Sequence, residues 1–130
     1  MQSNDCTEKG GGLLQNMIKT IPIKKNYEFV RIYKKGKFYV GKFIILYVVA
    51  NNFNLNRLGI TASKKVGNSV KRNRFRRLIK ENYRMVEERI KSGVDCVFVA
   101  RNCDEIPGYL EIKKEMKFLL KKLNIFDQEK

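Results

Sequence analysis

The stretch from Ser63 to Arg84, "SKKVGNSVKRNRFRRLIKENYR", joins a helical apolar stripe to a dense run of cations. Apolar side chains recur in and after it at i, i+3, i+4, i+8, i+11 and i+15, which places them on one side of an α-helix. They are Phe75, Leu78, Ile79, Tyr83, Val86 and Ile90. We therefore expect a central helix packed on a core, capped by Asn68 or Ser69 and ended near Lys91 by Ser92-Gly93.

The positive charge of this helix lies almost opposite its apolar stripe and at its N-terminal end. From Lys64 to Arg84 the chain holds nine Lys or Arg residues and one acid, Glu81, a local charge of +8 within a total of +15. A solvated face normally mixes signs. Cations at a helix N-terminus are also unfavourable by about 0.3–1 kcal/mol each. An external anion resolves both conflicts, and phosphate suits the donors of Arg and Lys.

These cations and one amide form the predicted nucleic-acid-binding set. Its members are Lys64, Lys65, Lys71, Arg72, Asn73, Arg74, Arg76, Arg77, Lys80 and Arg84. A loop containing Gly67 and the first amides of the helix add to the expected anion site. The alternative is a solvated face on a basic protein, which is the common case for a charged helix.

Composition limits the class of protein and its partners. A chain of 130 residues with 43% apolar residues fits one folded domain. A net charge of +15 favours a polyanionic partner, with nucleic acid first and a membrane surface second. The longest apolar run, Phe43 to Ala50, is too short to cross a bilayer. The three cysteines, Cys6, Cys96 and Cys103, are odd in number and lack metal-ligand spacing. No secretory signal is visible. We therefore expect a cytoplasmic protein without a membrane partner.

The remaining pattern predicts a small α+β domain of αββαβα order, or αβββαβα with an extra short strand at 38–40. Residues 1–16 read as a disordered extension or a non-native start, 17–125 as the domain, and 126–130 as a tail. The expected elements are a helix over 24–36 capped by Asn26, a β-rich run over 38–49, strands over 57–63 and 95–101, and a helix over 109–123.

The central block resembles the signature of the bacterial ribonuclease P protein component. The "RNR" at 72–74 follows "GITASKK" and "VGNSVK" and precedes "RRLIKE", and "EFVRIYKKG", "FIILYVV" and "CVFVAR" extend the resemblance from about Pro22 to Leu123. The resemblance implies a central sheet with an unusual left-handed βαβ crossover (ribosomal-protein-S5-domain-2-like), against the common right-handed rule. It also implies a subunit of the ribonucleoprotein that removes the 5′ leader from precursor tRNA.

The resemblance further implies how the work is divided. The RNA subunit would cleave the phosphodiester with Mg²⁺, while this chain, in a 1:1 complex, would bind the RNA subunit through the cations above and bind no cofactor itself. A cleft holding Phe29, Tyr33 and Tyr47 would take the single-stranded leader, because rings stack on bases regardless of sequence. Aromatic residues at i and i+4 are more often core, so a packing role for Phe29 and Tyr33 stays open. Tyr33 stands where the family pattern suggests Phe.

We predict no catalytic or metal-binding residues on the chain itself. It has no His, and its 13 acids are scattered without a carboxylate pair at metal-ligand spacing. The alternative function is another non-catalytic RNA-binding module, such as a ribosomal protein. A DNA-reading basic helix fits less well, because the apolar stripe ties this helix to its own core.

Overall fold

The structure is a computed structural model that describes residues 20–126. The expected extension over residues 1–16 and residues 127–130 of the expected tail lie outside the described residues. The elements, in chain order, are β1 (Thr20–Pro22), α2 (Asn26–Lys35), β2 (Lys37–Val40), β3 (Ile44–Ala50), β4 (Asn56–Thr61), the 3₁₀ turn η1 (Lys64–Val66), α3 (Ser69–Val86), the 3₁₀ turn η2 (Glu87–Arg89), β5 (Val94–Ala100) and α4 (Tyr109–Lys122).

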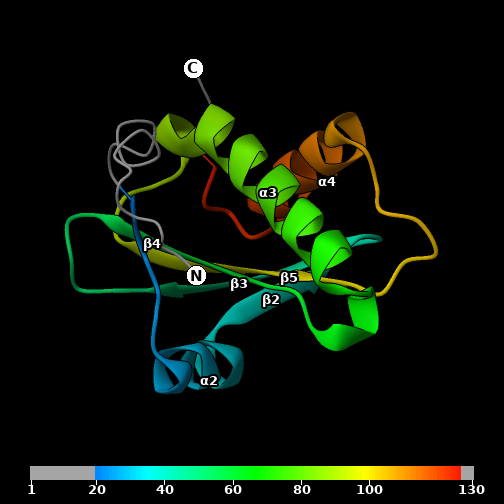
Figure 1. Ribbon diagram of the computed structural model, residues 1–130. Helices are drawn as coiled ribbons and strands as arrows, with labels where there is room; N and C mark the ends of the chain where they lie inside the picture. The colour runs from blue at the N-terminus through cyan, green and yellow to red at the C-terminus, as the bar shows by residue number, and fades with distance from the viewer. Residues whose placement is uncertain (1–19, 127–130) are drawn as a thin grey trace.

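Five strands form one mixed sheet in the order β1-β4-β5-β3-β2. The β2–β3 and β3–β5 pairs are antiparallel, whereas β1–β4 and β4–β5 are parallel. Figure 1 shows α3 and α4 on one face of the sheet and α2 on the other. The prediction of a single small α+β domain is confirmed, including the short strand near residues 38–40. Strand β1 was not predicted.

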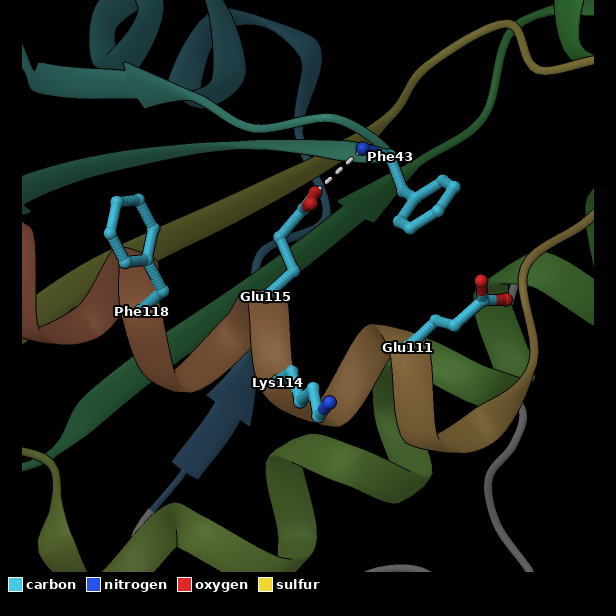
Figure 2. A pocket seen from close by; sticks show the side chains of 5 residues that line it. All are labelled: Phe43, Glu111, Lys114, Glu115 and Phe118. Carbon is cyan, nitrogen blue, oxygen red and sulfur yellow. Dashed lines mark hydrogen bonds between the residues drawn. The ribbon is translucent and has the colours of Figure 1, made fainter.

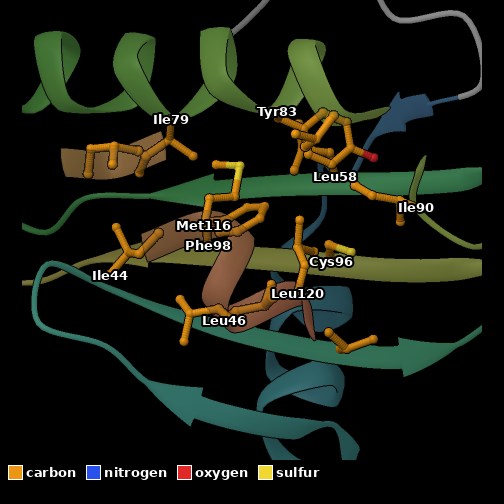
Figure 3. Packing of buried hydrophobic residues seen from close by; sticks show 14 of the residues in the cluster. Ile44, Leu46, Leu58, Ile79, Tyr83, Ile90, Cys96, Phe98, Met116 and Leu120 are labelled. Atoms are coloured by element: carbon orange, nitrogen blue, oxygen red, sulfur yellow. The ribbon is translucent and has the colours of Figure 1, made fainter. Parts of the chain in front are cut away.

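The main core lies between the sheet and the layer formed by α3 and α4. Figure 3 shows Ile79 and Tyr83 of α3 above the strands that carry Leu58 and Phe98. Met116 of α4 belongs to the same buried cluster. Because β4 and β5 are parallel neighbours, α3 is the crossover helix that returns the chain between them. This connection places the basic helix α3 against one face of the sheet.

Helix α3 matches the expected apolar stripe but ends earlier than expected. Asn68 is its N-cap, with its Oδ1 accepting a hydrogen bond from the Lys71 amide at 3.0 Å. The helix stops at Val86 rather than near Lys91 and continues as η2. The turn brings the buried Glu87 toward β1, where Thr20 donates from Oγ1 to the Glu87 carboxylate at 2.6 Å. A contact distant in sequence therefore holds the turn that follows the helix end.

Helix α2 also starts differently from the expectation. Asn26 is its first residue instead of its cap, and Lys25 at the N-cap position forms no side-chain capping bond. The amide of Gly36 bonds to the Ile32 carbonyl at 2.8 Å and ends the helix as expected. Ile32 is fully buried against the sheet and anchors α2 there together with Ile23 and Val97.

Candidate RNA-binding surface

The ten cationic and amide residues predicted from the sequence all lie on η1 and α3. Lys64 and Lys65 belong to η1, which Ser63 caps through a hydrogen bond from the Lys65 amide to Oγ. Gly67, with φ of 149°, makes the turn into α3, and a side chain there would collide with Lys71. The turn therefore holds the two η1 lysines against the first turn of α3.

Two arginines on one flank of α3 are close together and lack acidic partners. Asn82 on the other flank donates to the Tyr109 carbonyl at the start of α4, so Arg72 and Arg76 lie away from α4. Within residues 20–126 neither arginine forms an ion pair, and the Arg72 Nε is buried without a hydrogen-bond partner. Partial burial lowers the pKa of Arg76, and the nearby charge of Arg72 lowers it further. An anion between them would offset this repulsion.

Asn73 forms a local hydrogen bond that the sequence did not predict. Its Oδ1 accepts a hydrogen bond from Nη2 of Arg76 at 2.6 Å, which fixes the orientation of that guanidinium. Of the rest of the set, Arg74 and Arg77 are exposed, while Lys80 and Arg84 are half-buried. The cations thus cover the outer face and one flank of α3, next to η1.

A cluster of aromatic rings lies on the opposite face of the sheet, beside α2. The ring centroids of Phe29 and Tyr33 are 6.4 Å apart, and those of Tyr33 and Tyr47 are 4.9 Å apart. Phe38 stacks on Tyr47 at 5.4 Å and is a fourth member that the sequence analysis missed. Its signal was available in the pairing of β2 with β3, which sets Phe38 beside Tyr47. Phe29, Tyr33, Phe38 and Tyr47 are called the aromatic cleft below.

The four rings differ in burial and therefore in how accessible they are to a ligand. Phe29 is half-buried and lies directly on β4, where a Cβ built on Gly59 would come within 2.5 Å of its Cε1. Tyr33 and Phe38 are 37% and 56% exposed. Tyr47 points away from the main core that its neighbours Leu46 and Val48 join. Phe29 is therefore the packed base of the cleft, and Tyr33 and Phe38 present the accessible rings.

The aromatic cleft and the basic turn η1 lie at consecutive positions along the sheet. Strand pairing aligns Phe38, Tyr47, Val97 and Gly59 in one row across four strands. The next row on the same face contains Val40, Ile45, Val99 and Thr61, and all four are exposed or half-buried. Since Thr61 ends β4, the chain leads from this row directly into η1 with its two lysines. A continuous surface therefore connects the aromatic cleft to Lys64 and Lys65.

An ion-pair cluster holds α2 against the sheet at the other end of the cleft. Arg57 donates from Nε and Nη2 to the carboxylate of Asp95 at 3.0 and 2.8 Å, and from Nη1 to Glu28 of α2 at 2.7 Å. Asp95 is fully buried and also accepts from Asn51 at 2.7 Å. The hydrogen bond from Arg57 to Asp95 is the largest cause that raises the pKa of Arg57. The sequence did not reveal this cluster.

Residues 20–126 contain neither a cluster of metal-ligating side chains nor a membrane-spanning helix. No group of three or more His, Cys, Asp or Glu residues in that range gathers as metal ligands would. Within the same range no helix is long and apolar enough to span a bilayer. Burial raises the pKa of the Cys96 thiol to about 12, so it is a protonated core residue near neutral pH.

A basic helix with unpaired arginines, joined across the sheet to an exposed aromatic cleft, defines a small α+β nucleic-acid-binding protein. Comparison with known proteins makes the class specific. A model of the family described as Ribonuclease P matches residues 17–124. The ribonuclease P protein component of Clostridium botulinum is 47% identical over 106 residues, covering 81% of this chain and 96% of that protein. That of Clostridioides difficile is 42% identical over 108 residues, covering 82% and 95%.

Solved structures agree with the sequence relatives. The ribonuclease P protein of Staphylococcus aureus superposes with a TM-score of 0.73 at 36% identity, covering 82% of this chain and 97% of that one. That of Thermotoga maritima gives 0.70 at 25% identity, covering 78% and 96%. The chain belongs to the ribonuclease P protein family, whose members are protein components of the ribonucleoprotein that matures the 5′ end of tRNA. An RNA subunit is therefore its partner.

Proposed function

We propose that this chain binds the ribonuclease P RNA subunit through η1 and α3, and the 5′ leader of precursor tRNA through the aromatic cleft. The RNA subunit performs the Mg²⁺-dependent hydrolysis, and the protein positions the substrate and broadens the range of leaders accepted. The complex contains one protein per RNA and acts in the cytoplasm. The observation that carries this proposal is the continuous surface from the aromatic cleft to Lys64 and Lys65 of η1.

Electrostatics supports the RNA-subunit contact. Within the described residues, Arg72 and Arg76 lie next to each other without an acidic partner, and Asn73 orients Arg76. A phosphate entering this flank would relieve their repulsion and gain charge-assisted bonds. If about six cations of the set meet phosphates, the slope of log K against log salt concentration is roughly −4 to −5. Such a slope is far steeper than a solvated helix face would give.

The geometry of the rings supports leader binding. Stacking of a base on an exposed ring is worth about 1–3 kcal/mol and tolerates any base, as an enzyme that handles many leaders requires. The half-exposed row of Val40, Ile45, Val99 and Thr61 supplies an apolar floor between the rings and η1. A strand on this floor has its bases near the rings and its phosphates near Lys64 and Lys65.

The composition of the chain supports placing catalysis on the RNA. The sequence contains no His. Two of the described acids, Glu28 and Glu111, are engaged in local bonds with Arg57 and with the Gly108 amide. Within residues 20–126, no group of three or more His, Cys, Asp or Glu residues gathers as ligands of a protein-held Mg²⁺ would.

Reconstitution with a ribonuclease P RNA and precursor tRNA at low Mg²⁺ tests the proposal. We expect the chain to increase leader removal over RNA alone, and no stimulation would refute the assigned role. Phe38→Ala is expected to weaken binding of leader-bearing tRNA relative to mature tRNA by about 5- to 150-fold, the value of one stacked base. Equal losses of affinity for leader-bearing and mature tRNA would show that the Phe38 ring has a structural role instead. Leu110→Ala, at an exposed apolar residue on α4, is the matched control.

A further inference from the structure

Strand β2 forms one edge of the sheet and sends rings to both of its faces. In the described chain β2 pairs with β3 alone, and all four of its residues are exposed. Because side chains alternate along a strand, Phe38 points into the aromatic cleft and Tyr39 points to the opposite face, where α4 lies. The edge therefore separates two aromatic surfaces by a single residue.

The second surface pairs Tyr39 with Phe118 of α4. Their ring centroids are 5.6 Å apart in an edge-to-face arrangement, and the two side chains are 38% and 47% exposed. Next to them is a shallow hollow lined by Phe43, Glu111, Lys114, Glu115 and Phe118. Figure 2 shows Phe118 and Glu115 projecting from the same side of α4, with Glu115 reaching the amide of Phe43. Neither exposed ring belongs to the buried core.

The acids in this hollow are engaged by backbone amides. Glu115 accepts hydrogen bonds from the amides of Lys42, Phe43 and Ile44 at 2.7–2.9 Å, one of which is drawn in Figure 2. Glu111 accepts from the Gly108 amide at 2.8 Å. Both carboxylates are thus turned into local structure and away from a ligand lying on the rings.

Lysines lie around the hollow and beside the Phe118 ring. Lys114 and Lys122 precede and follow Phe118 by one helical turn, and the Lys122 Nζ lies 5.5 Å from its ring centroid. The Lys42 Nζ lies 5.3 Å from the Phe43 ring. Lys37 shares the face of Tyr39 on β2. Lysines next to exposed rings match the phosphates and bases of a single strand.

We propose that this surface, formed by Tyr39 and Phe118 with Lys37, Lys42, Lys114 and Lys122, binds the continuation of the single-stranded RNA held in the aromatic cleft. The strand passes around the β2 edge from Phe38 to Tyr39. The proposal rests on the proposed leader-binding role of the cleft. A second copy of the chain fits this surface less well, because an isologous contact would bring its lysines against each other.

Binding of unstructured oligouridylates to the full chain tests the inference. The length series runs from about 4 to about 16 nucleotides, the span of known single-strand sites. Fluorescence anisotropy is measured for the wild type, Phe118→Ala, Tyr33→Ala and the control Leu110→Ala. Tyr39→Thr provides a second variant that keeps strand propensity at the edge. Thermal melting and sedimentation accompany each variant to verify the fold and the oligomeric state.

The wild-type affinity should rise by a further step once the oligonucleotide is long enough to pass the β2 edge. Phe118→Ala and Tyr39→Thr should remove this step, lowering the affinity for long oligonucleotides by about 5- to 150-fold and leaving short ones unchanged. An unchanged step in both variants, an equal loss at all lengths, or dimerisation through this face would overturn the proposal. Failure of the cleft itself gives a different result, in which Tyr33→Ala has no effect on the shortest oligonucleotides.

Discussion

Replacing Gly59 with alanine tests the packing at the base of the aromatic cleft. The added methyl group would lie 2.5 Å from Cε1 and 2.9 Å from Cζ of Phe29, closer than such contacts allow. Helix α2 cannot easily retreat, because Arg57 ties its Glu28 to the sheet at 2.7 Å. The ring of Phe29 must therefore swing toward Tyr33 and disturb the cleft.

Two opposing effects determine the size of the change. Alanine in a strand interior is normally more stable than glycine by roughly 0.5–1 kcal/mol. Overpacking against a ring costs about 1–3 kcal/mol. We expect the collision with Phe29 to dominate, giving a net loss of about 1–2 kcal/mol and a melting temperature lower by about 4–8 °C.

A double-mutant cycle isolates the collision from the intrinsic effect of alanine. Phe29→Leu removes Cε1 and Cζ while keeping an apolar side chain. In that background Gly59→Ala should be neutral or stabilising, so the coupling energy measured by denaturant unfolding is about 1–3 kcal/mol. Gly59→Ala alone should also weaken leader binding while leaving affinity for the RNA subunit unchanged. A stabilising effect of Gly59→Ala in the wild-type chain would show that Phe29 does not occupy the position described.

Four further predictions concern other parts of the molecule. Arg77→Ala should weaken binding of the RNA subunit and make the salt slope shallower by about 0.7–0.9, whereas Lys91→Ala beyond the basic face should change neither. Asn73→Ala should weaken the same binding with an unchanged slope, because it releases a guanidinium without removing a charge. Glu115→Gln should lower stability by about 1–3 kcal/mol in chemical denaturation, since it weakens the acceptor for three amides; no loss would contradict the bonding described. Burial raises the pKa of Cys96 to about 12 in the folded state, above its value in the unfolded chain. The free energy of unfolding should therefore fall as the pH rises from the unfolded-state pKa toward 12. Cys96→Ala should make this fall shallower in denaturant unfolding measured across the same pH range.

Local patterns predicted the parts of the fold that depend on local chemistry. The apolar stripe of α3 and its Asn68 cap follow from helical spacing and capping preference, and the structure has both. Leu58 and Gly59 lie on opposite faces of β4, as the alternation of side chains along a strand requires. The grouping of the cationic set required only that its residues lie on α3 and on the turn before it.

Features that depend on contacts distant in sequence were not predictable. Strand β1 has three residues and is held by parallel pairing with β4, which no local pattern encodes. The early end of α3 is followed by a turn whose Glu87 bonds to Thr20, a residue 67 positions away in the sequence. Phe38 joins the cleft only because β2 pairs with β3 in one particular register. The fourth ring could therefore be recognised only after the strands were paired.

The ion pairs of Arg57 have a consequence for the energetics of ligand binding. Arg57 joins Asp95 of β5 to Glu28 of α2, so the wall of the cleft that carries Phe29 and Tyr33 is fixed before any strand arrives. Such preorganisation confines the entropy cost of association largely to the incoming RNA, because the protein has little left to order. If the proposed function holds, the same advantage applies to every leader that enters the cleft, whatever its sequence.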